Sequence, residues 1–253
     1  MTSATSAAPA AEATPALEAA GLHKRYGHLV VLDDVDFRVG ADAAVGIVGP
    51  NGAGKTTLLS VLSGSSHADA GGIRFRGEEI TGLPPQDRCR RGLARAHQVP
   101  KPFGGMTVLE NAFVGASSGA GLRGQPAYQR CIDVLELCGL VELANRRAES
   151  LGLLHRKRLE LARALATDPA VLLLDEIGGG LTDAEAAALV TTILQVRARG
   201  VAVVWIEHIV HVLVQVVDRL VCMDAGRVIA DGPPDTVMRE AAVVDAYLGR
   251  GAE

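Results

Sequence analysis

The stretch GPNGAGKT, Gly49–Thr56, decides the fold of this chain of 253 residues. It fits the pattern G-x-x-x-x-G-K-[ST], in which glycines let successive backbone N–H groups turn inward around an anion. The apolar run at positions 43–48 precedes it, and a helical pattern at positions 55–62 follows directly. A strand, a glycine-rich loop and a helix in this order predict a phosphate-binding loop, because the helix adds its positive end to the site. Lys55 would pair with the β- and γ-phosphates of a nucleotide, and the hydroxyl of Thr56 would ligate Mg²⁺.

A second apolar run, Ala170 to Leu174, ends in two adjacent carboxylates, Asp175 and Glu176. Taken alone, such a run is most often a buried strand that meets solvent at its end. Beside a phosphate-binding loop, the pair has a chemical use. Asp175 would hold the metal ion through water, and Glu176 would accept a proton from an attacking water. The two motifs together predict a site that hydrolyses a nucleotide.

Apolar runs alternate with helical patterns, which predicts a parallel sheet covered by helices. A third strand candidate, Val201 to Ile206, is separated from the second by a helical stretch, Asp183 to Arg199. The three candidates end in Gly49, in Asp175-Glu176 and in Glu207-His208. Ligands of open parallel sheets bind at the carboxyl ends of the strands. We therefore expect polar groups from distant parts of the sequence to meet in one crevice.

Two further lobes are predicted around this sheet. Short β-like spacing from Leu17 to Phe37 indicates a small antiparallel lobe, and positions 86–94 predict a basic helix. Positions 100–165 are rich in helix formers and predict an inserted helical lobe, interrupted by a flexible stretch from Ser117 to Gly124. The predicted fold class is therefore α/β: a P-loop NTPase core with a mostly parallel sheet, an N-terminal antiparallel β lobe and an inserted helical lobe, in one domain spanning 17–253.

Composition and charge exclude several other classes. Hydrophobic residues make up 48% of the chain and aromatic residues only 3%, which favours an α/β core of Val, Leu, Ile and Ala over a β-sandwich. The formal net charge of −4 provides no long-range attraction for nucleic acid. The basic side chains at positions 88–95 and 156–158 are therefore interpreted as solvated helix faces. Positions 201–223 are apolar but contain charged residues, which are too costly in lipid for a membrane span.

Features that report on the cellular compartment favour the cytosol. The four cysteines lack the spacing of a zinc site or a disulfide framework, so we expect reduced thiols. Positions 1–16 are rich in Ala, Pro and Ser and have neither a basic start nor an apolar centre. They predict a disordered tail rather than a secretory signal.

Six segments, read in order, resemble the ATP-binding subunits of ABC transporters. They are KRYGHLVVLDDVDF at 24–37, GPNGAGKTT at 49–57, HQ at 97–98, LELARAL at 159–165, VLLLDE at 171–176 and WIEH at 205–208. The resemblance covers about residues 17 to 249. Within the family, ITGLPPQDR at 80–88, MTVLEN at 106–111 and the closing VVDAYLG at 243–249 look like the importers of branched-chain amino acids and their urea and amide relatives.

The resemblance implies an ATPase that binds ATP and Mg²⁺ and couples hydrolysis to solute transport across a membrane. It assigns Tyr26 to stacking on adenine, although a lone tyrosine is also common as packing. It assigns Gln98 to the metal ion and the attacking water, and His208 to the γ-phosphate. The predicted site residues are Glu176, His208 and Gln98 for catalysis; Tyr26, Gly49, Pro50, Asn51, Gly52, Ala53, Gly54, Lys55, Thr56 and Thr57 for the nucleotide; and Thr56, Gln98 and Asp175 for the metal.

The chain departs from the family pattern at three places. LGLLH at Leu151–His155 stands where the family has L-S-G-G-Q or L-S-Y-G-Q, a stretch that serves the ATP held by the other subunit. Gly152 offers no hydroxyl there, and Leu154 adds a side chain where a close backbone approach is expected. Ile177 replaces the usual proline, and Thr182 replaces an Asp or Asn. Communication across the subunit boundary is therefore expected to differ from the family norm.

The implied partners follow from these features. A heterodimer with a second ABC ATPase subunit is favoured over a homodimer, because LGLLH would serve the opposite site poorly. Transmembrane permease subunits are further expected partners, with a solute-binding protein acting indirectly and no nucleic acid, and the place is the cytoplasmic face of the cell membrane. Two alternatives stay open: a soluble, non-transport ABC-type ATPase, and a catalytically impaired regulatory subunit of an ATPase heterodimer.

Overall fold

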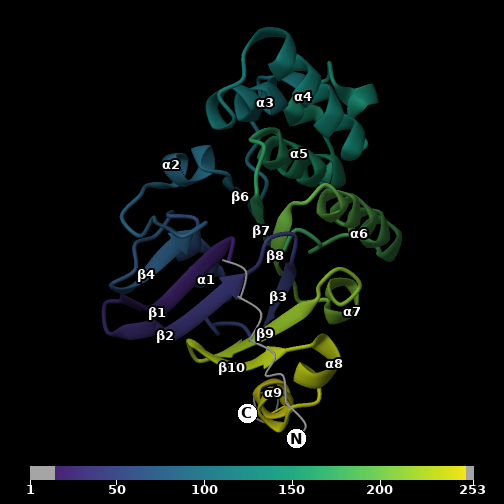
Figure 1. Cartoon of the computed structure of the whole chain (residues 1–253). Helices are drawn as coiled ribbons and strands as arrows, with labels where there is room; N and C mark the ends of the chain where they lie inside the picture. The colour runs from purple at the N-terminus through teal and green to yellow at the C-terminus, as the bar shows by residue number, and fades with distance from the viewer. Residues whose placement is uncertain (1–14, 249–253) are drawn as a thin grey trace, which may run out of the picture.

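A six-stranded sheet forms the centre of the computed structural model, which describes residues 15–248 (Figure 1). Its order is β10-β9-β3-β8-β7-β6, with β10 antiparallel to β9 and the other neighbours parallel. The predicted α/β class is confirmed. The strands are β3 (Ala44–Val48), β6 (Leu93–Ala96), β7 (Val171–Asp175), β8 (Ala202–Ile206), β9 (Arg219–Asp224) and β10 (Arg227–Gly232).

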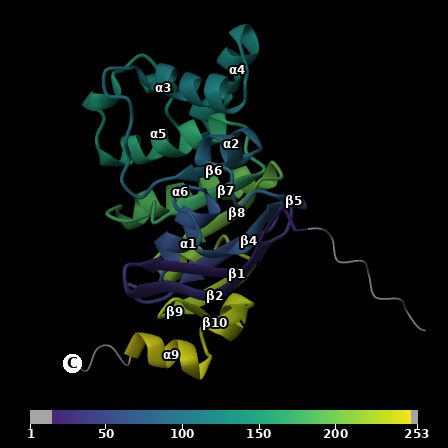
Figure 2. The same cartoon turned by 90° about the vertical axis from the view of Figure 1, so that its left-hand side faces the viewer.

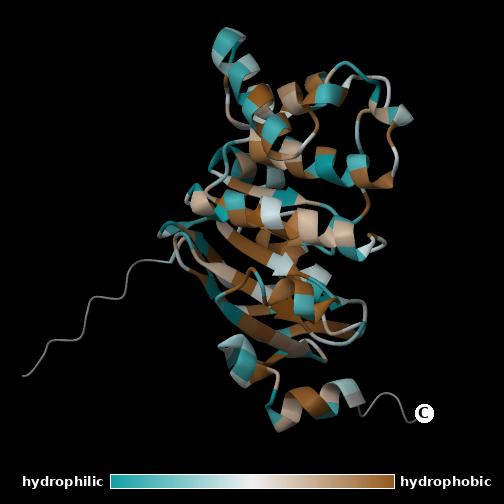
Figure 3. Cartoon of the chain, turned by 90° about the vertical axis from the view of Figure 1, so that its right-hand side faces the viewer, coloured by the Kyte–Doolittle hydropathy of each residue, from teal (hydrophilic) through white to brown (hydrophobic). Residues whose placement is uncertain are grey.

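The central strands β3, β7 and β8 are buried along their whole length, because both faces of the sheet are covered. Leu173 packs in the cluster that contains α1 (Lys55–Leu62), whereas its neighbour Leu172 packs in the cluster that contains α5 (Leu153–Ala166) and α6 (Asp183–Ala198). Figure 3 shows the central strands in hydrophobic colours beneath mixed helix surfaces. Continuous apolar runs, rather than alternating ones, are the sequence mark of this arrangement.

A separate antiparallel sheet in the order β2-β1-β4-β5 lies against α1 and forms the predicted N-terminal lobe. In β2, Val35, Phe37 and Val39 are buried and alternate with exposed residues, so one face packs inward. The buried residue before Val35 is Leu32, so two residues rather than one separate them. Asp34, which lies between them, has a φ of 57°, and the register with β1 shifts at this point. The strands are β1 (Leu17–Tyr26), β2 (Leu29–Val39), β4 (Ala70–Phe75) and β5 (Glu78–Glu79).

The helical lobe stands at one end of the molecule, in teal and green at the top of Figure 1. The first residues of the stretch predicted as flexible, Ser117 to Gly124, belong to a π-helical turn that spans Gly115–Gly119. Gly115 opens this turn against α5, since a Cβ there would lie 2.4 Å from the carbonyl oxygen of Arg163. The elements are α3 (Val108–Val114), the π turn Gly115–Gly119, α4 (Gly124–Leu137), two 3-10 turns at Val141–Leu143 and Ala148–Ser150, and α5.

The predicted basic helix at positions 86–94 is wrong in its second half. The helix α2 (Pro85–Arg90) ends early, because Gly92 has a φ of 101° and the chain enters strand β6. β6 is mostly buried and pairs in parallel with β7, so tertiary pairing overrides the local helical pattern.

The interpretation of the basic residues as solvated helix faces is also wrong at Arg88, Arg95 and Lys157, of which Lys157 is 8% exposed. Arg88 is 1% exposed, and its guanidinium donates hydrogen bonds to four backbone carbonyl oxygens, of Val61, Leu62, Thr81 and Leu83. Arg95 forms a buried ion pair with Asp175. A buried arginine is stabilised when most of its donors face oxygens, and a one-dimensional charge pattern does not show this pairing.

The predicted strand at Val201 to Ile206 is confirmed by β8, and the short helix α7 (Val210–Leu213) and β9 follow it. Across residues 15–248, no helix is long and apolar enough to span a bilayer. The chain closes with α8 (Pro234–Val237) and α9 (Ala241–Leu248). Positions 1–14 of the predicted tail lie outside the described residues. At Ala16 the prediction of disorder is wrong, because this residue is buried and its N–H donates to the carbonyl oxygen of Val39.

Candidate functional site

The loop Gly49–Thr56, called here the phosphate loop, connects the central strand β3 to α1. Its shape requires glycine at two positions. Gly49 has a φ of 140°, and a Cβ there would lie 2.0 Å from the carbonyl oxygen of Met223. Gly54 has a φ of 102°, and a Cβ there would lie 2.5 Å from the carbonyl oxygen of Val31. The loop is therefore pressed against β9 on one side and β2 on the other, as a backbone cradle for an anion needs.

Lys55 lies inside this loop and is almost fully buried. Its Nζ donates to the carbonyl oxygens of Gly49, at 2.7 Å, and of Pro50, at 2.9 Å. Burial lowers the pKa of Lys55, and the negative charges of Glu176 and Asp175 act in the opposite direction. The ammonium group is thus held by dipoles at the centre of the loop, with its third proton available to an anion.

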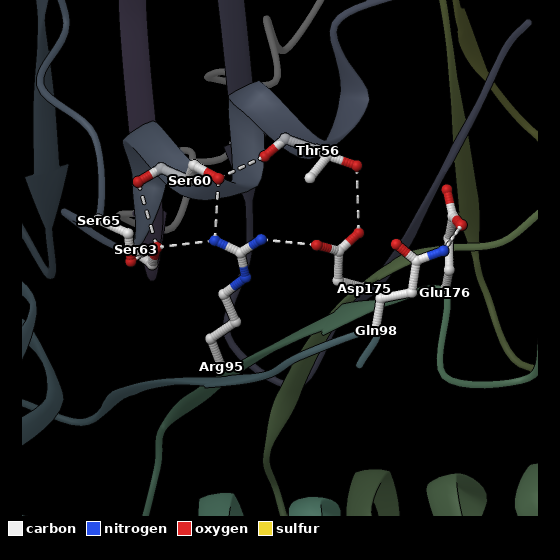
Figure 4. A network of polar contacts seen from close by, with 8 residues as sticks. All are labelled: Thr56, Ser60, Ser63, Ser65, Arg95, Gln98, Asp175 and Glu176. Carbon is white, nitrogen blue, oxygen red and sulfur yellow. Dashed lines mark hydrogen bonds and ion pairs between the residues drawn. The ribbon is translucent and has the colours of Figure 1, made fainter. Parts of the chain in front are cut away.

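The carboxylate of Asp175, at the end of β7, faces the first turn of α1 (Figure 4). Thr56 Oγ1 donates to Asp175 Oδ1 at 3.4 Å, and Arg95 Nη2 lies 2.6 Å from Asp175 Oδ2. Arg95 also donates to the hydroxyls of Ser60, at 3.0 Å, and Ser63, at 3.3 Å. One carboxylate oxygen is therefore fixed by a buried cation, and the other faces the hydroxyl that was predicted to bind the metal.

Glu176 joins the two other predicted catalytic residues. Its Oε2 accepts a hydrogen bond of 2.5 Å from Gln98 Nε2, and its Oε1 lies 2.7 Å from His208 Nε2. Glu176 has a φ of 47°, an uncommon conformation for a residue with a Cβ, and such conformations cluster at functional sites. The three side chains come from the segment after β6, the end of β7 and the end of β8.

The strand order confirms that the predicted strand ends meet, and the crevice itself stays a prediction. β3, β8 and β7 are neighbours in the sheet, so Gly49, Asp175-Glu176 and Glu207-His208 leave it at one edge. Tyr26 stands apart, at the end of β1, where its hydroxyl is 3.4 Å from Ser66 Oγ and Lys24 Nζ lies 5.3 Å from its ring centre. Its stacking role stays a prediction.

Sequence reasoning missed a second buried network beside Glu176. Glu207 accepts hydrogen bonds from the N–H groups of Gly178, at 2.6 Å, and His208, at 3.1 Å, and burial raises the pKa of its carboxyl. Lys157, on α5, donates to the carbonyl oxygens of Ile177, at 3.0 Å, and Gly179. The loop after Glu176 is therefore held from both sides. A single acid at the end of an apolar strand was the only signal for Glu207.

The altered stretch LGLLH begins α5. Gly152 is the N-cap residue and has no side chain to cap the helix, and Leu153 is 53% exposed. A Cβ at Gly152 would meet no atom within 4 Å, so a serine fits there. The departure at this position is thus one of chemistry, the missing hydroxyl, and not of space.

Comparisons with known proteins point in one direction. Residues 32–178 match the family model described as ABC transporter, and residues 227–253 match the model of the branched-chain amino acid ATP-binding cassette transporter. The chain is 36% identical to the high-affinity branched-chain amino acid transport ATP-binding protein BraF of Pseudomonas aeruginosa and 33% identical to LivG of Escherichia coli, each over 93% of this chain and 98% of the relative. It is also similar to the solved ADP conformation of an ATP-binding cassette, with a TM-score of 0.84, 29% identity and coverage of 93% of this chain and 99% of the other.

Proposed function

The chain belongs to the family of ABC transporter ATP-binding proteins, and we propose that it is the ATP-hydrolysing subunit of an importer for branched-chain amino acids or related small polar solutes. The observation that carries the proposal is the position of Glu176. It follows Asp175 directly and is held between Gln98 and His208, at the sheet edge that also carries the phosphate loop. The closing segment, whose model is that of the branched-chain amino acid cassettes, supports the solute class.

The phosphate loop suits a nucleotide polyphosphate. The loop ends at the start of α1, where the first N–H groups of a helix have no partner within it and would face an anion, and Lys55 supplies a fixed positive charge at the centre. We infer that Lys55 exchanges its contacts with the carbonyls of Gly49 and Pro50 for phosphate oxygens. Tyr26 would stack on the adenine ring at the edge of the antiparallel lobe.

The oxygen donors beside the loop suit Mg²⁺. The Thr56 hydroxyl and Asp175 Oδ1 are 3.4 Å apart, and the side chain of Gln98 lies between Asp175 and Glu176, with its Nε2 donating to Glu176 (Figure 4). In residues 15–248 no group of three or more His, Cys, Asp or Glu side chains is arranged to hold a metal ion, so an ion beside Thr56 and Asp175 would take its remaining ligands from phosphate and water. When bound, Mg²⁺ would neutralise charge on the phosphate oxygens.

Glu176 is assigned as the general base. One of its oxygens faces Gln98 and the other faces His208, so the carboxylate is oriented from both sides and can accept a proton from a water beside the phosphate. The two neighbours would keep that water and the γ-phosphate aligned, because positioning is the larger part of catalysis in phosphoryl transfer.

We infer that the working assembly pairs this chain with a second ABC ATPase subunit and with transmembrane permease subunits, at the cytoplasmic face of the cell membrane. A solute-binding protein would act indirectly, and nucleic acid is not a partner. The second ATPase subunit is expected to differ from this chain. Because Gly152 carries no hydroxyl, an ATP completed by Leu151–His155 should be hydrolysed slowly, whereas the ATP on this chain's own phosphate loop should turn over normally.

A catalytically impaired, regulatory role is the second candidate, and the exposed Leu153 and the uncapped Gly152 favour it. The variant Gly152→Ser tests in the assembled complex whether the missing hydroxyl limits the opposite site. If the missing hydroxyl limits the opposite site, the variant should raise its turnover by about tenfold to a hundredfold, the worth of one hydrogen bond to a charged group in the transition state. Unchanged turnover at both sites would show that LGLLH is a working variant.

The site assignment itself is tested by titration calorimetry of the full chain with MgATP. Lys55→Ala should weaken binding by about 1.5–3 kcal/mol, because it removes a charge-assisted contact with the phosphates. Arg74→Ala, an exposed cation on β4, serves as the control and should bind as the wild type does. Equal affinity of the Lys55→Ala variant and the wild type would contradict the assignment.

A further inference from the structure

The C-terminal helix α9 lies beneath strands β9 and β10, far along the chain from the phosphate loop (Figures 1 and 2). It is docked by one face. Val243 is buried in the cluster that also contains Val48 and Cys222, and Tyr247 follows one turn later on the same face. The other described side chains of α9 are mostly exposed, and Tyr247 itself is 42% exposed. Its attachment to the domain therefore rests on few contacts.

One of these contacts reaches the start of the phosphate loop. The backbone N–H of Gly49 donates to the hydroxyl oxygen of Tyr247 at 2.8 Å. The parallel pairing of β3 with β9 ends one residue earlier, at Val48 and Cys222. Gly49 is buried, so its N–H would lack a partner if the phenol were absent. The hydroxyl of Tyr247 therefore accepts a hydrogen bond from the backbone N–H of the first residue beyond the β3–β9 pairing.

Gly49 is held on both of its polar groups. Its N–H binds Tyr247, and its carbonyl accepts from Lys55 Nζ at 2.7 Å. In the proposed nucleotide complex Lys55 turns to the phosphates, which leaves the Tyr247 contact to fix this end of the loop. The contact rests on geometry, and partial burial raises the pKa of the Tyr247 phenol above its usual value.

We propose that Tyr247 is a positioning residue for nucleotide binding, through which the C-terminal helix fixes the conformation of Gly49 and the phosphate loop. The inference rests on the proposed function, since it concerns the same nucleotide site. It makes the docking of α9 and the binding of ATP mutually dependent, because each stabilises the same backbone geometry at Gly49. A displaced helix would lower ATP affinity, and bound ATP would hold the helix down.

The variant Tyr247→Phe tests this, because it keeps the ring and removes only the acceptor. We expect the Kd for MgATP of the full chain to rise roughly two- to tenfold, the effect of one lost hydrogen bond to a buried amide. In the assembled complex the KM for ATP should rise by a similar factor while kcat stays within about twofold. Amide exchange at positions 49–57 should become faster in the variant.

Tyr128→Phe is the matched control, since Tyr128 lies on α4, is 46% exposed and should leave affinity and exchange unchanged. If Tyr247→Phe binds MgATP as the wild type does, the inference is overturned, even if the melting temperature falls. Lys55→Ala separates this failure from that of the proposed function. A wild type that binds no better than Lys55→Ala would refute the nucleotide site itself.

Discussion

Replacing the buried Arg95 by Met should lower the free energy of unfolding by more than the same replacement at an exposed arginine does. The side chains of Arg95 and Asp175 are 9% and 3% exposed, and their closest atoms are 2.6 Å apart. The variant leaves the carboxylate buried without its cation and removes the donor from the hydroxyls of Ser60 and Ser63. Breaking a buried pair in this way costs about 3–5 kcal/mol.

The same change at Arg74 provides the scale. Arg74 pairs with Glu79 at 3.8 Å on the surface, where an ion pair contributes about 0–1 kcal/mol. For a domain of this size, the loss at Arg95 corresponds to a decrease in melting temperature of roughly 6–20 °C. The side chain of Met is similar in length to that of Arg, so the difference reports the charge and its hydrogen bonds rather than a large cavity.

Urea unfolding of Arg95→Met, Asp175→Asn and the double variant, at constant pH, measures the coupling between the two side chains. The double variant should be more stable than the sum of the single changes predicts, because neither lone charge is left buried. If Arg95→Met costs less than about 1 kcal/mol, or no more than Arg74→Met, the pair is not a buried structural element of the site. Hydrolysis should also fall in Arg95→Met, since Asp175 loses its orientation.

Three further outcomes are expected. Glu176→Gln should keep MgATP affinity and slow single-turnover hydrolysis by about 10²- to 10⁴-fold, because the amide is not basic; hydrolysis at the wild-type rate would show that Glu176 is not the base. Gly49→Ala should lower the free energy of unfolding by more than about 2 kcal/mol, because its Cβ would lie 2.0 Å from the Met223 carbonyl oxygen. The control is Gly27→Ala, whose Cβ would meet no atom within 4 Å and whose cost is backbone strain alone. Equal losses of the two variants in urea unfolding would contradict this. Burial lowers the pKa of Lys55 below 10.5, and phosphate would raise it again, so ATP affinity should be complete below the pKa of the free protein and decline as pH rises through it. Calorimetry from about pH 7 to about pH 10 measures this, and Lys55→Arg should show no such decline if Lys55 is the titrating group.

Much of the site could be predicted without a structure, because its chemistry is written in local patterns. The helix predicted at positions 55–62 matches α1 (Lys55–Leu62), and the predicted edge of the sheet does gather Gly49, Glu176 and His208. Apolar runs locate buried strands, and only a few backbone geometries connect a strand to a helix through G-x-x-x-x-G-K. What fails at this level is the pairing of polar groups that are distant in sequence.

The sequence by itself determined the α/β class, the phosphate loop and the carboxylates after β7, since each depends on neighbours along the chain. Only the tertiary structure decided that Arg95 pairs with Asp175, 80 positions away, and that the Gly49 amide meets Tyr247, 198 positions away. An arginine or tyrosine looks the same in a sequence whether water or a buried group satisfies it. Which of the two satisfies the side chain is decided by tertiary packing, because a buried donor that is shielded from water needs an acceptor within about 3 Å.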